Sequence, residues 1–400
     1  MAATINTNIA SINAQRNLTF SGQSLNTTMQ RLSSGLRVNS AKDDAAGLAI
    51  AERMSTQVRG LAVASRNAND GISLAQTAEG ALGKVGDMLQ RMRELAVQAG
   101  NATNSKSDRE ALNAELVQLR DEVDRVAKTT SFNGKKVLDG SFTGGVFQVG
   151  ANSGDNITVG ALANTKVDQL GKTEFGTTSV TGIADASKTA AANNMTNADV
   201  TIVITGANQV SAQVTIAKDA DVTGDEALGR VVQAINSKTA DTGIVAFLAE
   251  DGKSIQYRAE KNADGVLASA TMAVSGGGAA DVAALLANPT TANADQTGIH
   301  KMDIKTQAGA WESLQRIDSA LDKVSSARAE LGAIQTRFEK SIENIDIQQE
   351  NISAARGRIT DADFAQETAN LSRTQILQQA GTAMVAQANQ LPQQVLQLLQ

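Results

Sequence analysis

Cysteine is absent from this chain of 400 residues, histidine occurs once and proline twice. Without cysteine the chain forms neither disulfides nor thiolate metal sites, and a single histidine, His300, rules out the paired-histidine motifs of zinc enzymes. Few positions lack a backbone donor, because Pro289 and Pro392 are the only prolines. Long uninterrupted helices are therefore permitted, and most metal-enzyme classes are excluded.

Aromatic residues are also scarce, at 2% of the chain, although 42% of the residues are hydrophobic. Small apolar side chains suit closely packed helices better than a bulky globular core. No nucleophile–base pair, phosphate loop or metal cluster can be recognised. We therefore expect no enzyme, no catalytic residue, no metal and no cofactor.

Targeting and charge signals are weak. Residues 1–11 lack a basic region followed by an apolar run, and no stretch reaches the ~18 apolar residues of a membrane span. A net charge of −6 does not favour nucleic-acid binding. We expect no nucleic-acid partner, no membrane insertion and no cleaved signal peptide, so export would need another route.

Both ends of the chain carry a seam, here meaning a line of apolar residues at heptad spacing. Residues 1–42 hold four basic side chains and no acidic one, so their partner should be neutral or acidic. Residues 374–400 hold nine glutamines and no charge. The N-terminal seam is Ile5, Ile9 and Ile12, then Leu18, Gly22, Leu25, Met29, Leu32 and Leu36. The C-terminal seam is Leu377, Met384, Leu391 and Leu398, alongside Gly381, Ala388 and Val395.

Two further seams lie inside these ends. The first of them ends at a polar break at residues 105–108, and another apolar heptad segment follows that break. The helices before and after the break can therefore fold back on each other as a hairpin. The first seam is Met54, Leu61, Ala68, Ala75, Leu82, Leu89 and Ala96, and the segment after the break carries Leu112, Leu116, Leu119, Val123 and Val126. The second seam is Ile317, Val324, Leu331, Phe338, Ile345 and Ile352.

The middle of the chain loses helical periodicity. Glycine-rich text at residues 130–160 predicts a small β-hairpin region, and residues 166–305 predict an inserted α+β domain. Within the insert, Thr223 and Glu226 have capping-box spacing before an apolar run, and Asp251-Gly252 is a hairpin signal. The predicted fold is mainly α: a long antiparallel coiled-coil rod built from both chain ends, with a small β-hairpin region and one inserted α+β outer domain.

Seams at both ends imply that the terminal helices meet, in parallel or antiparallel register. A helix that buries only one face leaves surface that other copies can cover, and such contacts propagate into filaments unless they close. We therefore predict self-assembly. The predicted polymerisation seam is Ile5, Ile9, Ile12, Leu25, Leu32, Leu377, Met384, Leu391 and Leu398.

Several separated motifs then resemble one family, the bacterial flagellins. The run from Leu32 to Ile50 and the opening Ile5-Asn6-Thr7-Asn8 carry the resemblance. It is extended by residues 90–98, Phe132-Asn133-Gly134, residues 147–152 and residues 359–363. The resemblance covers roughly residues 1–160 and 310–400.

This resemblance implies an extracellular filament subunit for swimming motility. It implies a terminal coiled-coil domain at residues 1–42 and 356–400 forming an inner tube. Residues 43–165 and 306–355 would form an outer tube with the β-hairpin, and residues 166–305 a surface-exposed variable domain. The implied partners are copies of the chain, hook–filament junction and cap proteins, an export chaperone on the C-terminal helix, and a host Toll-like flagellin receptor.

Three positions match those through which some flagellins are detected by that receptor: Arg91, Leu95 and Glu115. The plainer interpretation is that they are exposed residues in axial contacts between subunits. Similarly, Lys42, Asp43 and Asp44 could form a charged functional cluster, but a helix break capped by Asp43 or Asp44 is favoured.

Two other functions stay open. A hook–filament junction protein shares the terminal helices, although the opening motif favours a filament flagellin. A surface polysaccharide-binding protein is the third reading, but carbohydrate sites use aromatic platforms. The insert offers only Phe175, Phe247 and Tyr257.

Overall fold

The computed structural model describes residues 8–173, 175–205, 211–219, 222–249, 251–259, 271–276, 279–286 and 298–398. The helices are α1 (Ile9–Ser34), α2 (Ala45–Ala99), α3 (Lys106–Thr129), α4 (Asp185–Asn197), α5 (Gly224–Asn236), α6 (Thr239–Thr242), α7 (Ala279–Ala283), the 3-10 helix η1 (Ile299–Lys301), α8 (Gln307–Thr360) and α9 (Phe364–Leu398). The strands are β1 (Ser131–Phe132), β2 (Lys135–Lys136), β3 (Gly145–Gln148), β4 (Asn156–Val159), β5 (Gly176–Val180), β6 (Val200–Thr205), β7 (Ser211–Ile216), β8 (Ile244–Leu248), β9 (Ile255–Ala259) and β10 (Thr271–Gly276).

Local signals set the ends of the long helices. Gly35 ends α1 in the left-handed conformation (φ 72°), and its N–H donates to the Arg31 carbonyl. Ser105 begins α3 with a capping box to Asp108, which confirms the predicted break after α2. Helices α2 and α8 run for 55 and 54 residues without a proline. The mainly helical fold with long seams is therefore as predicted.

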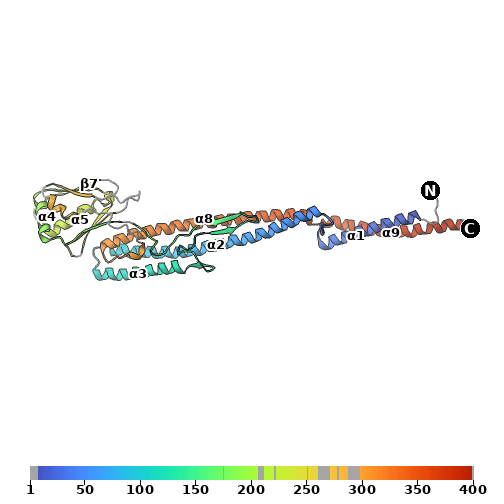
Figure 1. Cartoon of the computed structure of the whole chain (residues 1–400), viewed down its shortest axis with the longest axis horizontal. Coiled ribbons are helices and arrows are strands. Elements are labelled where there is room, and N and C mark those ends of the chain that lie inside the picture. Colours follow the sequence, from blue (N-terminus) through green and yellow to red (C-terminus); the bar gives the residue numbers. More distant parts are fainter. Residues whose placement is uncertain are drawn as a thin grey trace. The chain divides into compact units, whose positions relative to one another are not determined.

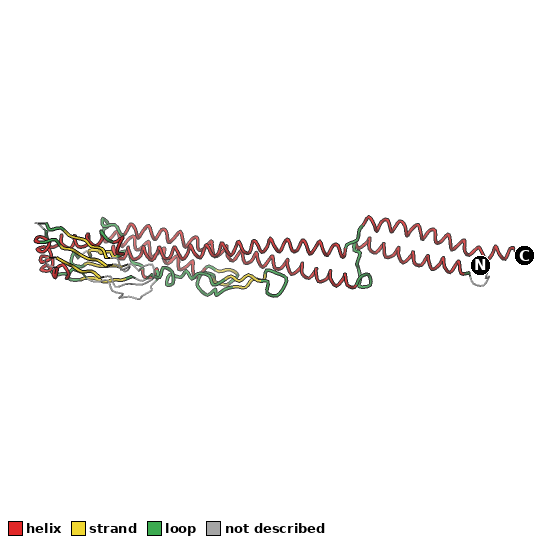
Figure 2. Tube along the Cα trace, turned by 90° about the horizontal axis from the view of Figure 1, so that it is seen from above, coloured by secondary structure: helices red, strands yellow, loops and turns green. Residues whose placement is uncertain are grey.

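The chain forms two compact units. Unit 1 comprises residues 1–71, 146–157 and 337–400, and unit 2 comprises residues 72–145 and 158–336. In unit 1, α1 lies beside α9 (Figures 1 and 2). The two helices are antiparallel, because Asn8 contacts Ala388 whereas Leu36 pairs with Asp361. The structure thus decides between the parallel and antiparallel arrangements of the terminal helices that the sequence left open.

The rest of unit 1 has a second small core. Leu61 and Ala64 of α2 cluster with Ile345 of α8, and Val149 packs against them. The Phe338 ring is fully buried and meets Phe147 edge-on at 5.4 Å between ring centroids. These contacts hold the β3–β4 hairpin against the two helices.

In unit 2, the predicted seam residues form the helical core. The seam residues of α2 and α8 in this unit have between 0 and 3% of their surface exposed: Ala75, Leu82, Leu89, Ala96, Ile317, Val324 and Leu331. In α3 the seam is buried only at Leu116 and Val123, whereas Leu112, Leu119 and Val126 are partly buried. Arg93 and Asp318 form an ion pair between α2 and α8 at 2.7 Å. The heptad pattern therefore identified the buried face of each long helix.

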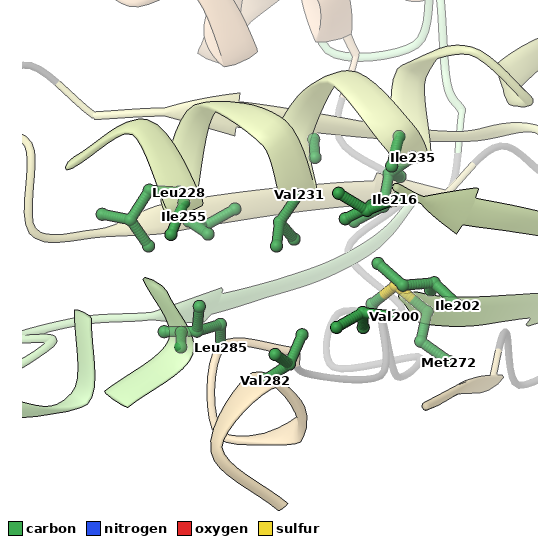
Figure 3. Close-up of a cluster of buried hydrophobic side chains, with 14 of the residues drawn as sticks. Val200, Ile202, Ile216, Leu228, Val231, Ile235, Ile255, Met272, Val282 and Leu285 are labelled. Atoms are coloured by element: carbon green, nitrogen blue, oxygen red, sulfur yellow. The ribbon is translucent and has the colours of Figure 1, made fainter. Parts of the chain in front are cut away.

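The insert in unit 2 is an α+β domain, as predicted. Its strands form two antiparallel sheets, in the orders β10-β6-β7 and β5-β9-β8. Both sheets share one core with α4, α5 and α7. Figure 3 shows Leu228 of α5 beside Ile255 of β9, and Ile235 of α5 beside Ile216 of β7.

The local predictions inside the insert and the hairpin region are also confirmed. Thr223 and Glu226 form the capping box of α5. Gly252 lies in the β8–β9 turn with φ 60°. Residues 130–160 hold the two hairpins β1–β2 and β3–β4. Throughout the residues that the structure describes, every helix falls short of the combined length and apolarity that a membrane span requires.

Candidate subunit interface

The α1–α9 pair is joined by polar groups near the start of α1. Asn8 accepts from the Ser11 N–H through Oδ1 and donates through Nδ2 to the Ala388 carbonyl at 2.7 Å. Ser11 Oγ donates to Asn389 Oδ1, also at 2.7 Å. One asparagine therefore caps α1 and fixes its position against α9.

Small side chains allow the two helices to approach closely. Ser11 and Thr28 of α1 and Thr374 and Ala388 of α9 are buried. A Cβ added at Gly381 would lie 3.1 Å from a methyl carbon of Leu18, which is tighter than an ordinary contact. The contact faces of α1 and α9 therefore contain small buried side chains, several of which are polar.

This geometry corrects one detail of the predicted N-terminal seam. The heptad spacing placed Met29 on the contact face, but the structure buries Thr28 and leaves 54% of Met29 exposed. Leu25 and Leu32 are half-buried in the described chain. Leu25, Thr28 and Leu32 are spaced by three and four residues, so the contact face of α1 passes through Thr28 and not through Met29.

Most of the large apolar side chains face away from the pair. Of the predicted seam residues, Ile9, Ile12, Leu377 and Met384 have between 49 and 65% of their surface exposed. Four side chains of these helices outside the predicted polymerisation seam share this exposure: Phe20, Met29, Phe364 and Ile376. Ile5 lies outside the described residues; the Leu391 and Leu398 backbones belong to α9, but their side chains are outside the described part.

A second contact joins the two connections between helices. The Arg37 N–H donates to the Thr360 carbonyl at 2.7 Å, and the Ala362 N–H donates to the Gly35 carbonyl at 3.0 Å. The Arg37 guanidinium also donates to the Ile359 carbonyl at 2.7 Å. A cation at the C-terminal end of α8 is favourable because the last carbonyls of a helix carry partial negative charge.

The Lys42–Asp44 run is a capped helix break, as favoured from the sequence. Asp44 Oδ1 accepts from the Gly47 N–H at 2.8 Å at the start of α2. Asp43 Oδ2 accepts from the Ser40 hydroxyl and from the Asn39 and Ser40 N–H groups. These hydrogen bonds, the Ser40 hydroxyl first, lower the pKa of Asp43. The carboxylates therefore have a local structural explanation.

The Arg91, Leu95 and Glu115 group lies in unit 2 and is only partly a surface. The Arg91 guanidinium donates to Glu115 Oε1 at 2.9 Å and to Glu94 Oε2 at 2.8 Å, and hydrogen bonds to both carboxylates raise its pKa. The side chains of Arg91 and Glu115 are about half exposed. Leu95, however, is 1% exposed, which corrects its expected exposure. Contact with another chain could use only Arg91 and Glu115 side chains, and that role stays a prediction.

Comparison with known proteins places both ends of the chain in one family. Residues 5–143 match the bacterial flagellin N-terminal helical region, and residues 314–399 match the bacterial flagellin C-terminal helical region. Flagellin A of Vibrio cholerae serotype O1 is 44% identical over 404 residues, and the alignment covers 100% of both chains. B-type flagellin of Pseudomonas aeruginosa is 37% identical over 490 residues, again with 100% of both chains. Among solved structures, FliC from Burkholderia pseudomallei is 26% identical, with a TM-score of 0.39 over 67% of this chain and 99% of that one.

Proposed function

Because this chain belongs to the bacterial flagellin family, and is thus a structural subunit of the flagellar filament, we propose that it polymerises through the exposed apolar faces of α1 and α9. As a filament subunit it is located outside the cell, in the flagellum. The residues proposed for this contact are the exposed seam positions Ile9, Ile12, Leu377 and Met384. Phe20, Met29 and Ile376 extend the same contact.

A single observation carries the proposal. Within the chain, α1 and α9 bury small and polar side chains against each other, while at least seven large apolar side chains of these two helices remain about half exposed or more: Ile9, Ile12, Phe20, Met29, Ile376, Leu377 and Met384. An isolated pair would place its largest apolar residues inside. The reversed arrangement is explained if neighbouring subunits cover the outer faces.

The energy available from this surface is comparable with the cost of associating one pair of subunits. Complete burial of a large aliphatic side chain contributes about 1.5–3 kcal/mol, so a half-exposed one still offers roughly 1 kcal/mol. Seven such residues offer about 7 kcal/mol, which falls within the estimated association cost of about 4–15 kcal/mol. The contact of one pair is therefore marginal alone, and several neighbours around each subunit make the polymer stable.

Truncation tests the proposal directly. A chain lacking residues 374–400, or residues 1–42 together with 374–400, should remain monomeric when seeds and salt are added, as observed by electron microscopy. The insert and the core of unit 2 should keep their secondary structure by circular dichroism, since their contacts lie outside the removed segments. Long fibres of normal diameter formed by the doubly truncated chain would refute the proposal.

The domain scheme follows from the same premise and is part of the proposal. Residues 1–42 and 356–400 would form the inner tube, residues 43–165 and 306–355 the outer tube, and residues 166–305 the surface domain. A wall of uncharged glutamines on the last helix would present little electrostatic hindrance to a chain in transit. Its replacement by lysines should slow filament growth more than it weakens subunit association.

The remaining partners are proposed at a finer level. An export chaperone that binds the C-terminal helix would cover the exposed Leu377 and Met384 before assembly, and export would proceed without a cleaved signal peptide. Junction and cap proteins would meet the same helices at the filament ends. A Toll-like flagellin receptor would contact Arg91 and Glu115. Arg91→Ala should then reduce receptor binding of the monomer, and unchanged binding would remove Arg91 from that contact.

A further inference from the structure

A cavity of about 590 Å³ in unit 2 belongs to none of the contacts described so far. Its walls come from the α2–α3 connection, the β8–β9 hairpin and the start of α8. The volume falls in the range of roughly 300–1,000 Å³ that is typical of small-molecule sites. All three walls lie within one compact unit, so the cavity is part of its fold.

The charge on the walls has one sign. Lys106, Arg109 and Lys305 line the cavity, and no Asp or Glu is among the described residues that line it. Neither lysine forms an ion pair within the part of the chain that the structure describes, and both are exposed. Asp108 and Asp303 do not line the cavity but lie behind its wall, where they accept hydrogen bonds from the Ser105 and Lys305 N–H groups. An anion in the cavity would relieve the mutual repulsion of these cations.

The polar wall is also held in place. Arg109 is buried and donates from Nε to the Ala99 carbonyl at 3.1 Å and from Nη2 to the Asn101 carbonyl at 3.2 Å. These bonds satisfy carbonyls at the end of α2 and fix the α2–α3 connection beside the cavity. Lys106, which also lines the cavity, is the first residue of α3, where backbone N–H groups have no intrahelical acceptor. A preformed wall of donors lowers the ordering cost of binding.

The lining also includes apolar side chains. Phe247 and Leu248 of β8 line the cavity together with Ala308 of α8, and Gln256 of β9 adds a polar group to the same hairpin. Phe247 pairs with Gln256 of β9 and lies on the face of its sheet opposite the buried Ala246 and Tyr257. The cavity lining therefore combines apolar side chains with cationic ones.

We propose that this cavity binds a small organic anion, with its carboxylate or phosphate held by Lys106 and Lys305, and its apolar part on Phe247 and Leu248. Such a ligand would join the β8–β9 hairpin of the insert to the helical part of the same unit. The site is separate from the polymerisation faces of α1 and α9.

Ligand-observed NMR of the full-length chain tests the site with three probes: phenylacetate, its neutral analogue phenylacetamide, and inorganic phosphate. Phenylacetate should bind about tenfold more tightly than phenylacetamide, because charge-assisted hydrogen bonds are lost with the neutral amide. Lys106→Gln with Lys305→Gln should weaken phenylacetate binding by about tenfold. The control Lys84→Gln removes another exposed lysine, outside the cavity, and should leave binding unchanged.

The probes also separate the sources of affinity. Displacement of phenylacetate by phosphate would assign the affinity to the anionic group, and failure of displacement would assign a share to the apolar wall; both outcomes support the site. Absence of saturation transfer with both anions would overturn the proposal. So would an equal loss of binding in the Lys84→Gln control.

Discussion

The double variant Leu377→Gln with Met384→Gln should impair polymerisation without unfolding the subunit. It replaces two large apolar residues of α9 that face outward. These side chains are 49% and 65% exposed, so they contribute little to the α1–α9 contact within one chain. Glutamine has nearly the helix propensity of leucine and methionine, so α9 itself should be unaffected. The change removes only the apolar surface that a neighbouring subunit would cover.

The expected magnitude follows from the exposed area. Covering the exposed half to two thirds of each side chain contributes about 1–1.5 kcal/mol, given about 1.5–3 kcal/mol for complete burial. The two substitutions together then cost about 2–3 kcal/mol per subunit, which raises the critical concentration for polymerisation by about 30- to 150-fold.

Sedimentation of polymer after seeding, over a range of subunit concentrations, measures this critical concentration. The control Gln378→Ser with Gln387→Ser alters exposed polar positions of the same helix and should leave the critical concentration within about twofold. Circular dichroism should give equal helix content for all variants. A critical concentration unchanged by Leu377→Gln with Met384→Gln would show that neighbouring subunits do not cover this face of α9.

Three further predictions concern the fold. Gly35→Ala should destabilise the α1–α9 contact by about 1 kcal/mol, because the φ of 72° at Gly35 is unfavourable for a residue with a Cβ. The control Gly22→Ala should not destabilise it, although an added Cβ meets no atom within 4 Å at either position. Equal critical concentrations for polymerisation of the two variants would contradict this prediction. Lys188→Met should cost about 1–3 kcal/mol of insert stability, because buried Lys188 donates to Asp225 and to the Gly252 carbonyl. Lys188 lowers the pKa of Asp225, so the unsubstituted insert should lose stability as the pH falls below about 4. The melting temperature of the Lys188→Met variant should change less over the same pH range. Tyr257→Phe should cost about 1–2 kcal/mol by leaving the Leu285 carbonyl unpaired. Burial raises the pKa of Tyr257, so the stability of the insert should fall as the pH rises above about 10. The Tyr257→Phe chain should lack this alkaline loss, and thermal melts that show an equal loss of stability in both chains would refute the prediction.

The sequence predicted helix ends and hairpins because their causes are local. The Ser105 and Thr223 capping boxes and the Asp251-Gly252 turn involve residues only a few positions apart, and the structure contains all three. The interior seams were equally predictable, as Leu89 and Phe338 illustrate, because a long regular repeat leaves one face to bury.

The contact between the two chain ends was less predictable. The sequence indicated that the ends would meet, but periodicity alone fits parallel and antiparallel pairs equally well. Their antiparallel direction became evident from contacts such as that of Asn8 with the Ala388 carbonyl. These residues are 380 positions apart and carry no local signal. The contact face of α1 buries Thr28 and leaves Met29 exposed, and this rotation of the helix about its own axis is not specified by the apolar pattern.

The sequence by itself therefore determined that long helices form, where some of them begin, which faces are apolar, and which family the chain resembles. Only the tertiary structure decided which apolar residues are used within the chain and which are left outside. It placed Leu95 in the core and Met384 at the surface, although both are apolar residues at helical spacing. The physical reason is that apolarity states a preference for burial without naming the partner, and the partner is fixed by packing between distant segments.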